Sequence, residues 1–181
     1  RATKNQPKTL SRRISRFGKR KVMTTNYKNG KRNGSAEIYH DNGSLKIKYS
    51  RKEGKPHGKC EVFYRNGQKH MKGNYENGYK SGSWETFHKN GQLWFKEIYK
   101  EGELDGVSLE YYENGLLRSK SNFKKGEPDG IYEEYHENGL LLCIGNVNEE
   151  EDLWKYFDER GNPDKSEESK MIDDLIDKYL S

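Results

Sequence analysis

The sequence lacks long apolar runs, and apolar residues make up only 30% of its 181 positions. A helix that crosses a membrane needs about 20 predominantly apolar residues, so we expect no transmembrane segment. We also find no signal-peptide pattern and expect that the chain is not secreted. A compact globular domain of this length would normally contain more apolar residues. The shortage therefore indicates a fold that buries little.

Cysteine is also scarce, with only Cys60 and Cys143. The two residues stand far apart in a repetitive sequence, so we expect them not to meet and to remain free thiols. Free thiols are typical of a reducing compartment. We therefore expect the protein in the cytoplasm or in an assembled particle.

Patterns that carry chemistry are missing as well. We find no cluster of ligands with metal-site spacing, no glycine-rich phosphate loop and no serine in a nucleophile setting. We expect no catalytic residue, metal, cofactor or small-molecule substrate, and we predict that the chain is not an enzyme.

Glycine, by contrast, recurs at regular spacing. An aromatic residue three positions before an Asn-Gly pair occurs five times with a period of 24 residues. The glycines of these pairs are Gly43, Gly67, Gly91, Gly115 and Gly139. Two further glycine columns, which start at Gly30 and Gly34, keep the same period. A fixed period of this length indicates a stacked array of repeats.

The repeats predict the fold class. Asn-Gly between two strand-like runs predicts a β-hairpin with a two-residue type I′ turn, and the link from Gly30 to Gly34 predicts a longer turn. We expect an all-β repeat protein, an elongated single-layer antiparallel β-meander of about ten to twelve strands. Five repeats would occupy residues 26–145, and a degenerate capping repeat residues 146–165.

A two-residue loop would also fix the register of each hairpin. In three hairpins this register places a glutamate opposite a lysine: Glu37 with Lys48, Glu61 with Lys72, and Glu85 with Lys96. It also predicts that Asp41 faces Ser44 and that Tyr39 faces Lys46. Opposite charges in such positions contribute about 0.2–1 kcal/mol per pair. We interpret the lysine series as part of the sheet rather than as a polyanion site.

Strand alternation predicts two faces. One face would carry Ala36, Ile38, Leu45, Ile47 and Tyr49 with their equivalents, and the other the Glu/Lys pairs with an aromatic column. The aromatic column is Tyr39, Phe63, Phe87, Tyr111 and Tyr135. The charged face is predicted to become apolar late in the array, at Leu109, Leu116, Leu140, Leu142 and Ile144.

The histidines follow the repeats. His40, His88 and His136 occupy one column and alternate there with Tyr64 and Tyr112. This alternation favours a flat ring with a polar tip beside the turn over a catalytic base.

The two ends of the sequence differ from the repeats. Residues 1–25 predict a disordered or partner-bound basic arm, because residues 1–21 contain nine basic residues and no acidic one. The residues that we expect to contact an acidic partner are Arg12, Arg13, Arg16, Phe17, Lys19, Arg20 and Lys21. Residues 166–181 predict an amphipathic helix. We expect this helix to cap the array on Leu140, Leu142 and Ile144, or alternatively to bind a partner.

The unit Gly-x-x-x-Gly-x-aromatic-x-x-aromatic-x-x-Asn-Gly-x-Leu resembles the MORN repeat in its variant form. The match is clearest from Gly78 to Leu93 and from Gly126 to Leu141, and the resemblance covers roughly residues 26–161. It implies a curved single-layer sheet and roles in scaffolding, dimerisation and protein contacts. Similar proteins are often labelled antitoxin-like or occur in large DNA viruses, and lipid binding has been proposed for the class.

Three hypotheses for function remain open. The first is a non-enzymatic scaffold, a structural component of a larger assembly such as a viral particle, whose partners are other proteins or further copies of the chain. The second is an antitoxin-like inhibitor of a partner enzyme. The third is binding of a polyanion, either nucleic acid or an anionic membrane, through residues 1–21.

Overall fold

The structure is a computed structural model that describes residues 9–16, 19–28, 30–149 and 154–164, with side chains from residue 30 onward. The chain divides into two units, Arg1–Glu103 and Leu104–Ser181. We call them unit 1 and unit 2. The predicted C-terminal helix, residues 166–181, and Phe17 of the arm lie outside the described residues.

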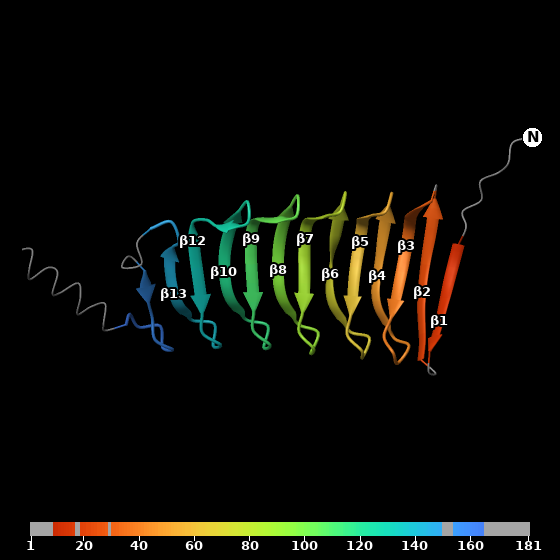
Figure 1. Cartoon of the computed structure of the whole chain (residues 1–181). Coiled ribbons are helices and arrows are strands. Elements are labelled where there is room, and N and C mark those ends of the chain that lie inside the picture. Colours follow the sequence, from red (N-terminus) through yellow and green to blue (C-terminus); the bar gives the residue numbers. More distant parts are fainter. Residues whose placement is uncertain (1–8, 17–18, 29, 150–153, 165–181) are drawn as a thin grey trace, which may run out of the picture. The chain divides into compact units, whose positions relative to one another are not determined.

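Unit 1 is a meander in which each described strand is antiparallel to the next along the chain. Figure 1 shows these strands side by side in one layer. The strands are β1 (Thr9–Arg16), β2 (Lys19–Lys28), β3 (Lys31–Tyr39), β4 (Leu45–Lys52), β5 (Lys55–Phe63), β6 (Lys69–Glu76), β7 (Tyr79–Phe87) and β8 (Leu93–Lys100).

Unit 2 repeats the same plan in the order β9-β10-β12-β13-β14, with the short β11 paired to β10. Its strands are β9 (Glu103–Tyr111), which starts on the last residue of unit 1, β10 (Leu117–Lys124), β11 (Glu127–Pro128), β12 (Ile131–Tyr135), β13 (Leu141–Asn146) and β14 (Lys155–Tyr156). The predicted all-β antiparallel meander is confirmed.

Strands β1 and β2 lie where the sequence predicted an arm without regular structure. Thr9 pairs with Asn26 and Arg16 with Lys19, and β2 pairs onward with β3. Hydrogen bonds to a neighbouring strand satisfy the backbone N–H and C=O groups of this segment, whatever its side chains are. The prediction of an unstructured arm rested on charge and on the spacing of apolar residues. Neither property indicates whether the backbone pairs with another strand.

The Asn-Gly turn differs from the predicted two-residue type I′ turn. In the first hairpin the Gly43 N–H donates to the His40 carbonyl at 3.0 Å, and the His40 N–H donates to the Ser44 carbonyl at 2.8 Å. Gly43 has a φ of +87°, whereas Asn42 is not among the residues with positive φ. These contacts define a type I turn followed by a left-handed glycine, the usual three-residue hairpin loop.

This turn changes the register beside it, and a β-bulge restores the register further in. Tyr39 faces Leu45, and the register shifts before Ile38 faces Ile47. The predicted pairs Asp41–Ser44 and Tyr39–Lys46 are therefore wrong. Because of the bulge, Leu45 lies on the same face as Tyr39, opposite to its predicted face.

The link between successive hairpins, which the sequence predicted to be a longer turn, is instead the two-residue type I′ turn, so this prediction is wrong. Glu53 and Gly54 have φ values of +52° and +88° and lie between the paired Lys52 and Lys55. The equivalent non-glycine residues Asn77, Glu101 and Lys125 have φ values between 51° and 52°. An ordinary side chain in this left-handed region costs about 1–2 kcal/mol, and asparagine costs less. Of these turns, Asn77-Gly78 therefore has the sequence best suited to its backbone.

We predict that Glu53→Asn and Glu101→Asn each raise the free energy of unfolding by about 1 kcal/mol, because asparagine tolerates the left-handed region. Asn77→Glu should lower it by a similar amount. Urea denaturation measures these changes, provided that the m-value is the same in every variant. Glu137→Asn, an exposed substitution in an Asn-Gly turn with the same change of charge, is the control. Equal gains in all three glutamate variants would contradict the prediction.

Few side chains are fully buried. The buried apolar residues of the described chain are Ala36, Cys60, Trp84 and Cys143, and Trp84 is only 1% exposed. The Trp84 ring lies flat over Gly73 of β6, where an added Cβ would lie 2.1 Å from the ring. In unit 2 the Trp154 ring covers Gly145 in the same way, at 2.2 Å. Each indole thus needs a residue without a side chain on the strand beside it.

We predict that Gly73→Ala lowers the free energy of unfolding by about 2–3 kcal/mol, because the methyl group overlaps an indole that cannot move away. Ser121→Ala, at the equivalent repeat position where no indole lies, should change it by less than about 0.5 kcal/mol. Thermal and urea denaturation of the two variants test this. A loss for Gly73→Ala that is no larger than for Ser121→Ala would show that the packing is loose.

Candidate interaction surface

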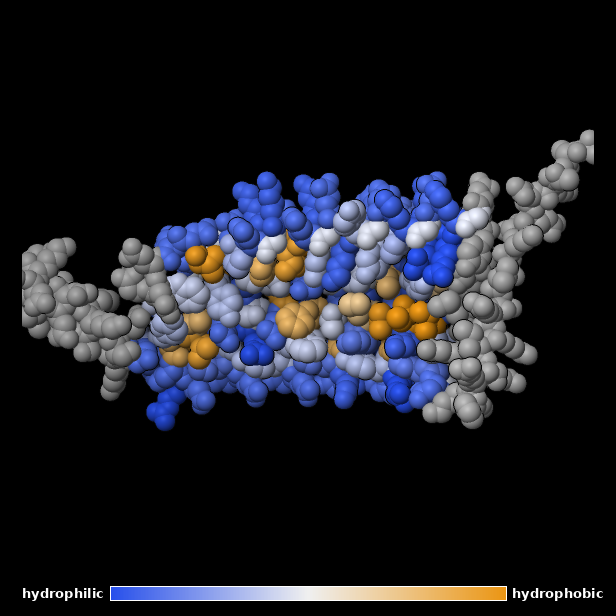
Figure 2. Space-filling model, in the orientation of Figure 1, coloured by the Kyte–Doolittle hydropathy of each residue, from blue (hydrophilic) through white to orange (hydrophobic). Residues whose placement is uncertain are grey.

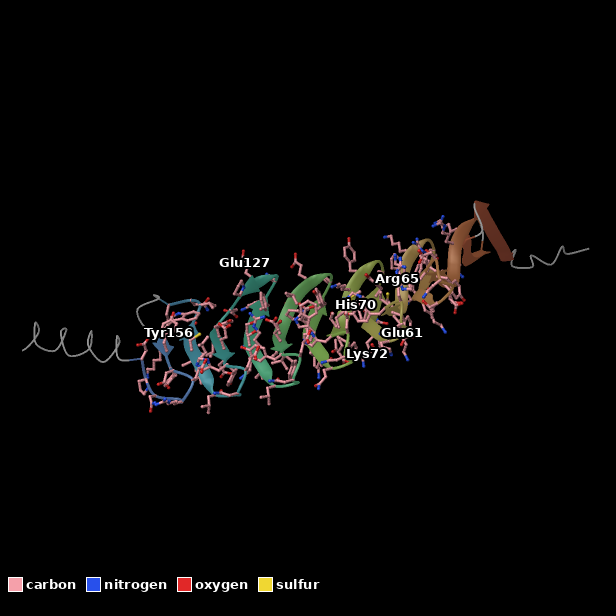
Figure 3. The ribbon with its side chains drawn as sticks, turned by 90° about the horizontal axis from the view of Figure 1, so that it is seen from below. Glu61, Arg65, His70, Lys72, Glu127 and Tyr156 are labelled. Carbon is pink, nitrogen blue, oxygen red and sulfur yellow. The ribbon has the colours of Figure 1, made fainter. Side chains whose placement is uncertain are left out.

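A row of alternating charges crosses one face of unit 1. We call it the charged row, and its members are Glu37, Lys48, Glu61, Lys72, Glu85 and Lys96. Neighbours in the row face each other both within and between hairpins. Figure 3 shows two labelled members, Glu61 and Lys72, on the ribbon. Each internal lysine therefore lies between two glutamates.

The ion pairs in this row do not all follow the hairpins. Lys72 contacts Glu85 of the next hairpin at 2.7 Å, while Lys48 lies 3.9 Å from Glu37. Glu61 accepts a hydrogen bond from Lys69 at 2.9 Å, and this bond, with Lys69 and Lys48 nearby, lowers the pKa of the Glu61 carboxyl. Exposed pairs of this kind contribute little individually, about 0–1 kcal/mol. A neutralised row of this kind supports the interpretation of the lysines as part of the sheet.

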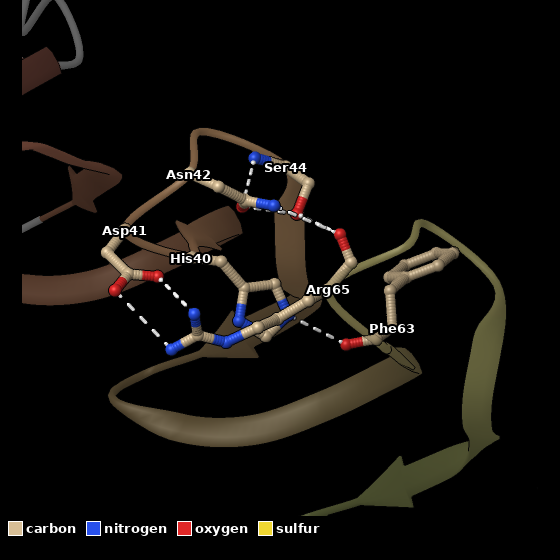
Figure 4. A network of polar contacts seen from close by, with 6 residues as sticks. All are labelled: His40, Asp41, Asn42, Ser44, Phe63 and Arg65. Carbon is tan, nitrogen blue, oxygen red and sulfur yellow. Dashed lines mark hydrogen bonds and ion pairs between the residues drawn. The ribbon is translucent and has the colours of Figure 1, made fainter. Parts of the chain in front are cut away.

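The Asn-Gly turns form a second regular feature, a series of bonds from one repeat to the next (Figure 4). His40 Nε2 donates to the Phe63 carbonyl at 3.0 Å, and the Asn42 amide donates to the Arg65 carbonyl at 3.1 Å. Arg65 also contacts Asp41 at 3.1 Å. We call this series the turn ladder. The predicted turn glycines all have positive φ: Gly43, Gly67, Gly91, Gly115 and Gly139.

The turn ladder explains why histidine alternates with tyrosine. The Tyr64 hydroxyl donates to the Phe87 carbonyl at 2.8 Å, as His40 does to Phe63. In unit 2, Tyr112 and His136 make the same contact with the carbonyls of Tyr135 and Phe157, respectively. Each ring reaches a backbone acceptor one repeat further on. The alternation was the sequence signal for this contact, but the acceptor was not predicted.

The opposite face of unit 1 carries an apolar row. Its members face one another across β3 to β8, and all are apolar except Thr86, which carries a hydroxyl: Ile38, Ile47, Val62, Met71, Thr86 and Phe95. All six side chains are half-buried. With strands about 4.8 Å apart the row is about 24 Å long, and no charged residue interrupts it. Figure 2 shows apolar side chains across the middle of these strands, between hydrophilic margins.

Aromatic residues lie beside this row. Trp84 contacts the rings of Tyr75 and Tyr99 at centroid distances of 5.0 and 6.3 Å. The Lys80 ammonium lies 4.7 Å from the Trp84 ring centroid and 4.1 Å from that of Tyr99. Burial, together with the nearby Glu97 carboxylate, raises the pKa of Tyr99 to about 12. Unit 1 thus has a face that is apolar and aromatic, with Lys80 and the Glu97 carboxylate beside the aromatic rings.

In unit 2, the positions equivalent to the apolar row and the charged row carry different side chains. The positions equivalent to the apolar row are Glu110, Ser119, Glu134, Cys143 and Tyr156. Those equivalent to the charged row are Leu109, Lys120, Glu133, Ile144 and Lys155. The face that is apolar in unit 1 therefore becomes acidic and hydroxyl-bearing in unit 2.

The predicted late apolar patch does not form one surface. Leu109 and Ile144 lie in the row just described. Leu116 and Leu140 are each 43% exposed in the turns, near the glycine of the next turn. Leu142 is the additional residue of the bulge between Leu141 and Cys143. The bulges, which the sequence did not reveal, separate these positions.

The basic residues that we expect to contact an acidic partner lie in the first two strands. Arg12, Arg13 and Arg16 lie in β1, and Lys19, Arg20 and Lys21 lie in β2, but their side chains are outside the description, so polyanion binding stays a prediction. Among the described residues, no three metal-ligating side chains gather into a candidate metal site. In the same part of the chain, no helix has the length and apolar character to cross a membrane.

The fold defines an open antiparallel protein built from β-hairpin repeats. A model of the MORN repeat variant family matches five consecutive segments, residues 32–53, 56–77, 80–101, 104–125 and 128–148. The chain belongs to this family, which supports a binding or scaffolding role. A search of curated proteins finds no match.

The raised pKa of Tyr99 predicts a stability change at alkaline pH. Its contribution is fully present below about pH 10, where unfolded tyrosines are neutral, and is lost as pH rises through about 12. We expect Tyr99→Phe to reduce the loss of unfolding free energy between pH 10 and 11.5, as measured by urea denaturation. Tyr79→Phe, at a side chain that is 60% exposed, is the control. Equal effects of the two substitutions would contradict the assignment.

Proposed function

We propose that the protein is a non-enzymatic scaffold that binds other proteins through the apolar row of unit 1. The observation that carries this proposal is a row of half-buried, uncharged side chains across six strands, five of them apolar and the sixth Thr86. The element pairs in extensive contact within the described residues are sheet neighbours, so none of these elements covers the row. A largely apolar row that no other described element covers is typical of protein interaction sites.

The charge distribution supports a place in a larger assembly. Residues 1–103 contain 25 basic and 9 acidic residues, a net charge of +16. Residues 104–181 contain 9 basic and 20 acidic residues, a net charge of −11. Complementary charge guides association and excludes wrong partners. A chain with one basic and one acidic unit is suited to oriented packing among several proteins, as in a particle.

The test places a photo-crosslinking amino acid at Val62, in the apolar row, or at Lys59, exposed on the other face of the same strand. We expect a crosslinked protein from the native source at position 62 and not at position 59. The purified partner should then bind the Val62→Glu chain at least about tenfold more weakly than the unaltered chain.

The identity of the crosslinked protein separates the remaining hypotheses. A structural protein of a particle supports the assembly role, and a single enzyme supports an antitoxin-like inhibitor. A polyanion partner of residues 1–21 would instead show steep salt dependence and no response to Val62→Glu. Equal crosslinking at positions 62 and 59, or none at either, would contradict binding through the apolar row.

A further inference from the structure

We propose that Asn77-Gly78 is a site of spontaneous modification in the folded protein, at which the asparagine converts to aspartate and isoaspartate. The two residues form the type I′ turn between Glu76 of β6 and Tyr79 of β7. We call the turns of this kind, between successive hairpins, the link turns. The proposal is independent of the proposed function, because it concerns the chemistry of a turn and not a binding surface.

The reaction requires an asparagine whose side chain can turn toward the nitrogen of the next residue. The Gly78 nitrogen loses its proton and attacks the side-chain carbonyl carbon of Asn77, so that a carbon–nitrogen bond forms. The bond from that carbon to Nδ2 breaks, and Nδ2 takes up the proton and leaves as ammonia. Water then opens the five-membered imide ring at either carbonyl and gives aspartate or isoaspartate. This chemistry is one reason why asparagine is a thermolabile residue.

The sequence alone does not select this site. The tripeptide Glu-Asn-Gly occurs three times, at residues 76–78, 113–115 and 137–139. In all three, the glycine N–H donates to a backbone carbonyl, at 2.8 Å for Gly78 and 2.9 Å for Gly115 and Gly139. The attacking nitrogen is therefore held to a similar degree at each site. Any large difference in reactivity must come from how the fold treats the asparagine side chain.

The turn ladder holds the asparagine side chains of the Asn-Gly turns at both ends. Asn114 Oδ1 accepts from the Leu116 N–H at 2.9 Å, and the Asn114 amide donates to the Glu137 carbonyl at 2.9 Å. Asn138 makes the equivalent two bonds at 2.9 and 2.7 Å. These bonds must break before the carbonyl carbon can face the glycine nitrogen in the geometry of attack. The fold therefore protects the asparagines of the turn ladder.

The link turn gives Asn77 no such protection. The Asn77 backbone N–H lies 3.4 Å from His57 Nδ1, but neither side-chain atom of Asn77 has a hydrogen-bonding partner among the residues that the structure describes. The residue is also exposed. Its side chain can thus turn toward Gly78 without the loss of any bond within the described chain. Identical tripeptides therefore stand in two environments, one held and one free.

The two products should affect the link turn differently. Aspartate tolerates the left-handed region as asparagine does, so it keeps the turn and adds one negative charge. Isoaspartate carries the side-chain methylene in its backbone, which adds an atom to the turn between the paired Glu76 and Tyr79. We therefore expect the isoaspartate form of the chain to unfold at a lower urea concentration than the unmodified form.

The experiment incubates the full-length chain at neutral pH and follows each asparagine by tryptic peptide mapping with mass spectrometry. Asn77 should convert several-fold faster than Asn114 and Asn138 in the folded chain. In concentrated urea the three rates should become similar, because the tripeptides are the same. Equal rates in the folded chain, or a preference for Asn77 that persists in urea, would overturn the proposal.

Two variants test the assignment to the link turn. Glu101→Asn places the same pair in the equivalent turn, where the Gly102 N–H donates to the Lys80 carbonyl at 3.0 Å. Position 101 should then convert at a rate close to that of Asn77. Asn77→Gln, whose longer side chain cannot form the five-membered ring, should remove the conversion from the tryptic peptide of residues 73–80.

Circular dichroism of both variants should show unchanged strand content, so that an altered rate reports the turn and not a loss of the fold. A position 101 that stays unmodified in folded Glu101→Asn would contradict the proposal. Conversion that persists in the peptide of residues 73–80 of Asn77→Gln would also contradict it, because the reacting residue would then be Asn74.

Discussion

Each strand of this protein is held by backbone hydrogen bonds to the strands beside it, and the described elements provide no second layer. Every other feature depends on this constraint. A single layer cannot bury a large core, which is why only four apolar side chains are buried in the described chain. Specific contacts between neighbouring strands take the place of a core: an indole over a glycine, a lysine between glutamates, a ring against the next turn. The low apolar content of the sequence follows directly.

The same constraint leaves both faces available, and the repeats use them differently in the two units. In unit 1, the charged row neutralises itself and the apolar row lies on the other face. In unit 2, the equivalent positions exchange much of this character. The backbone plan is shared, so the two units differ in the side chains that they place on each face.

Much of the fold could be predicted because the glycine period and the hairpins are local properties of the sequence. The turn types could not, because Asn-Gly usually indicates a type I′ turn. Here it forms the three-residue loop, and Glu53-Gly54 adopts the type I′ turn instead. The three-residue loop shifts the strand register beside it, and a bulge restores the register further in. These bulges place Leu45 on the other face and divide the expected late apolar patch. Most of the apolar row was expected on one face, whereas its contrast with unit 2 depends on the register.

The turn ladder has a direction: His40, Tyr64, Tyr112 and His136 each donate forward to a carbonyl of the repeat that follows. One period of 24 residues therefore carries one donor for the next repeat and one acceptor for the previous repeat. Duplication or deletion of a whole period would leave every remaining donor with its acceptor, whereas a partial period would break the series. The length of such a protein can thus change in evolution by whole repeats without the invention of a new interface.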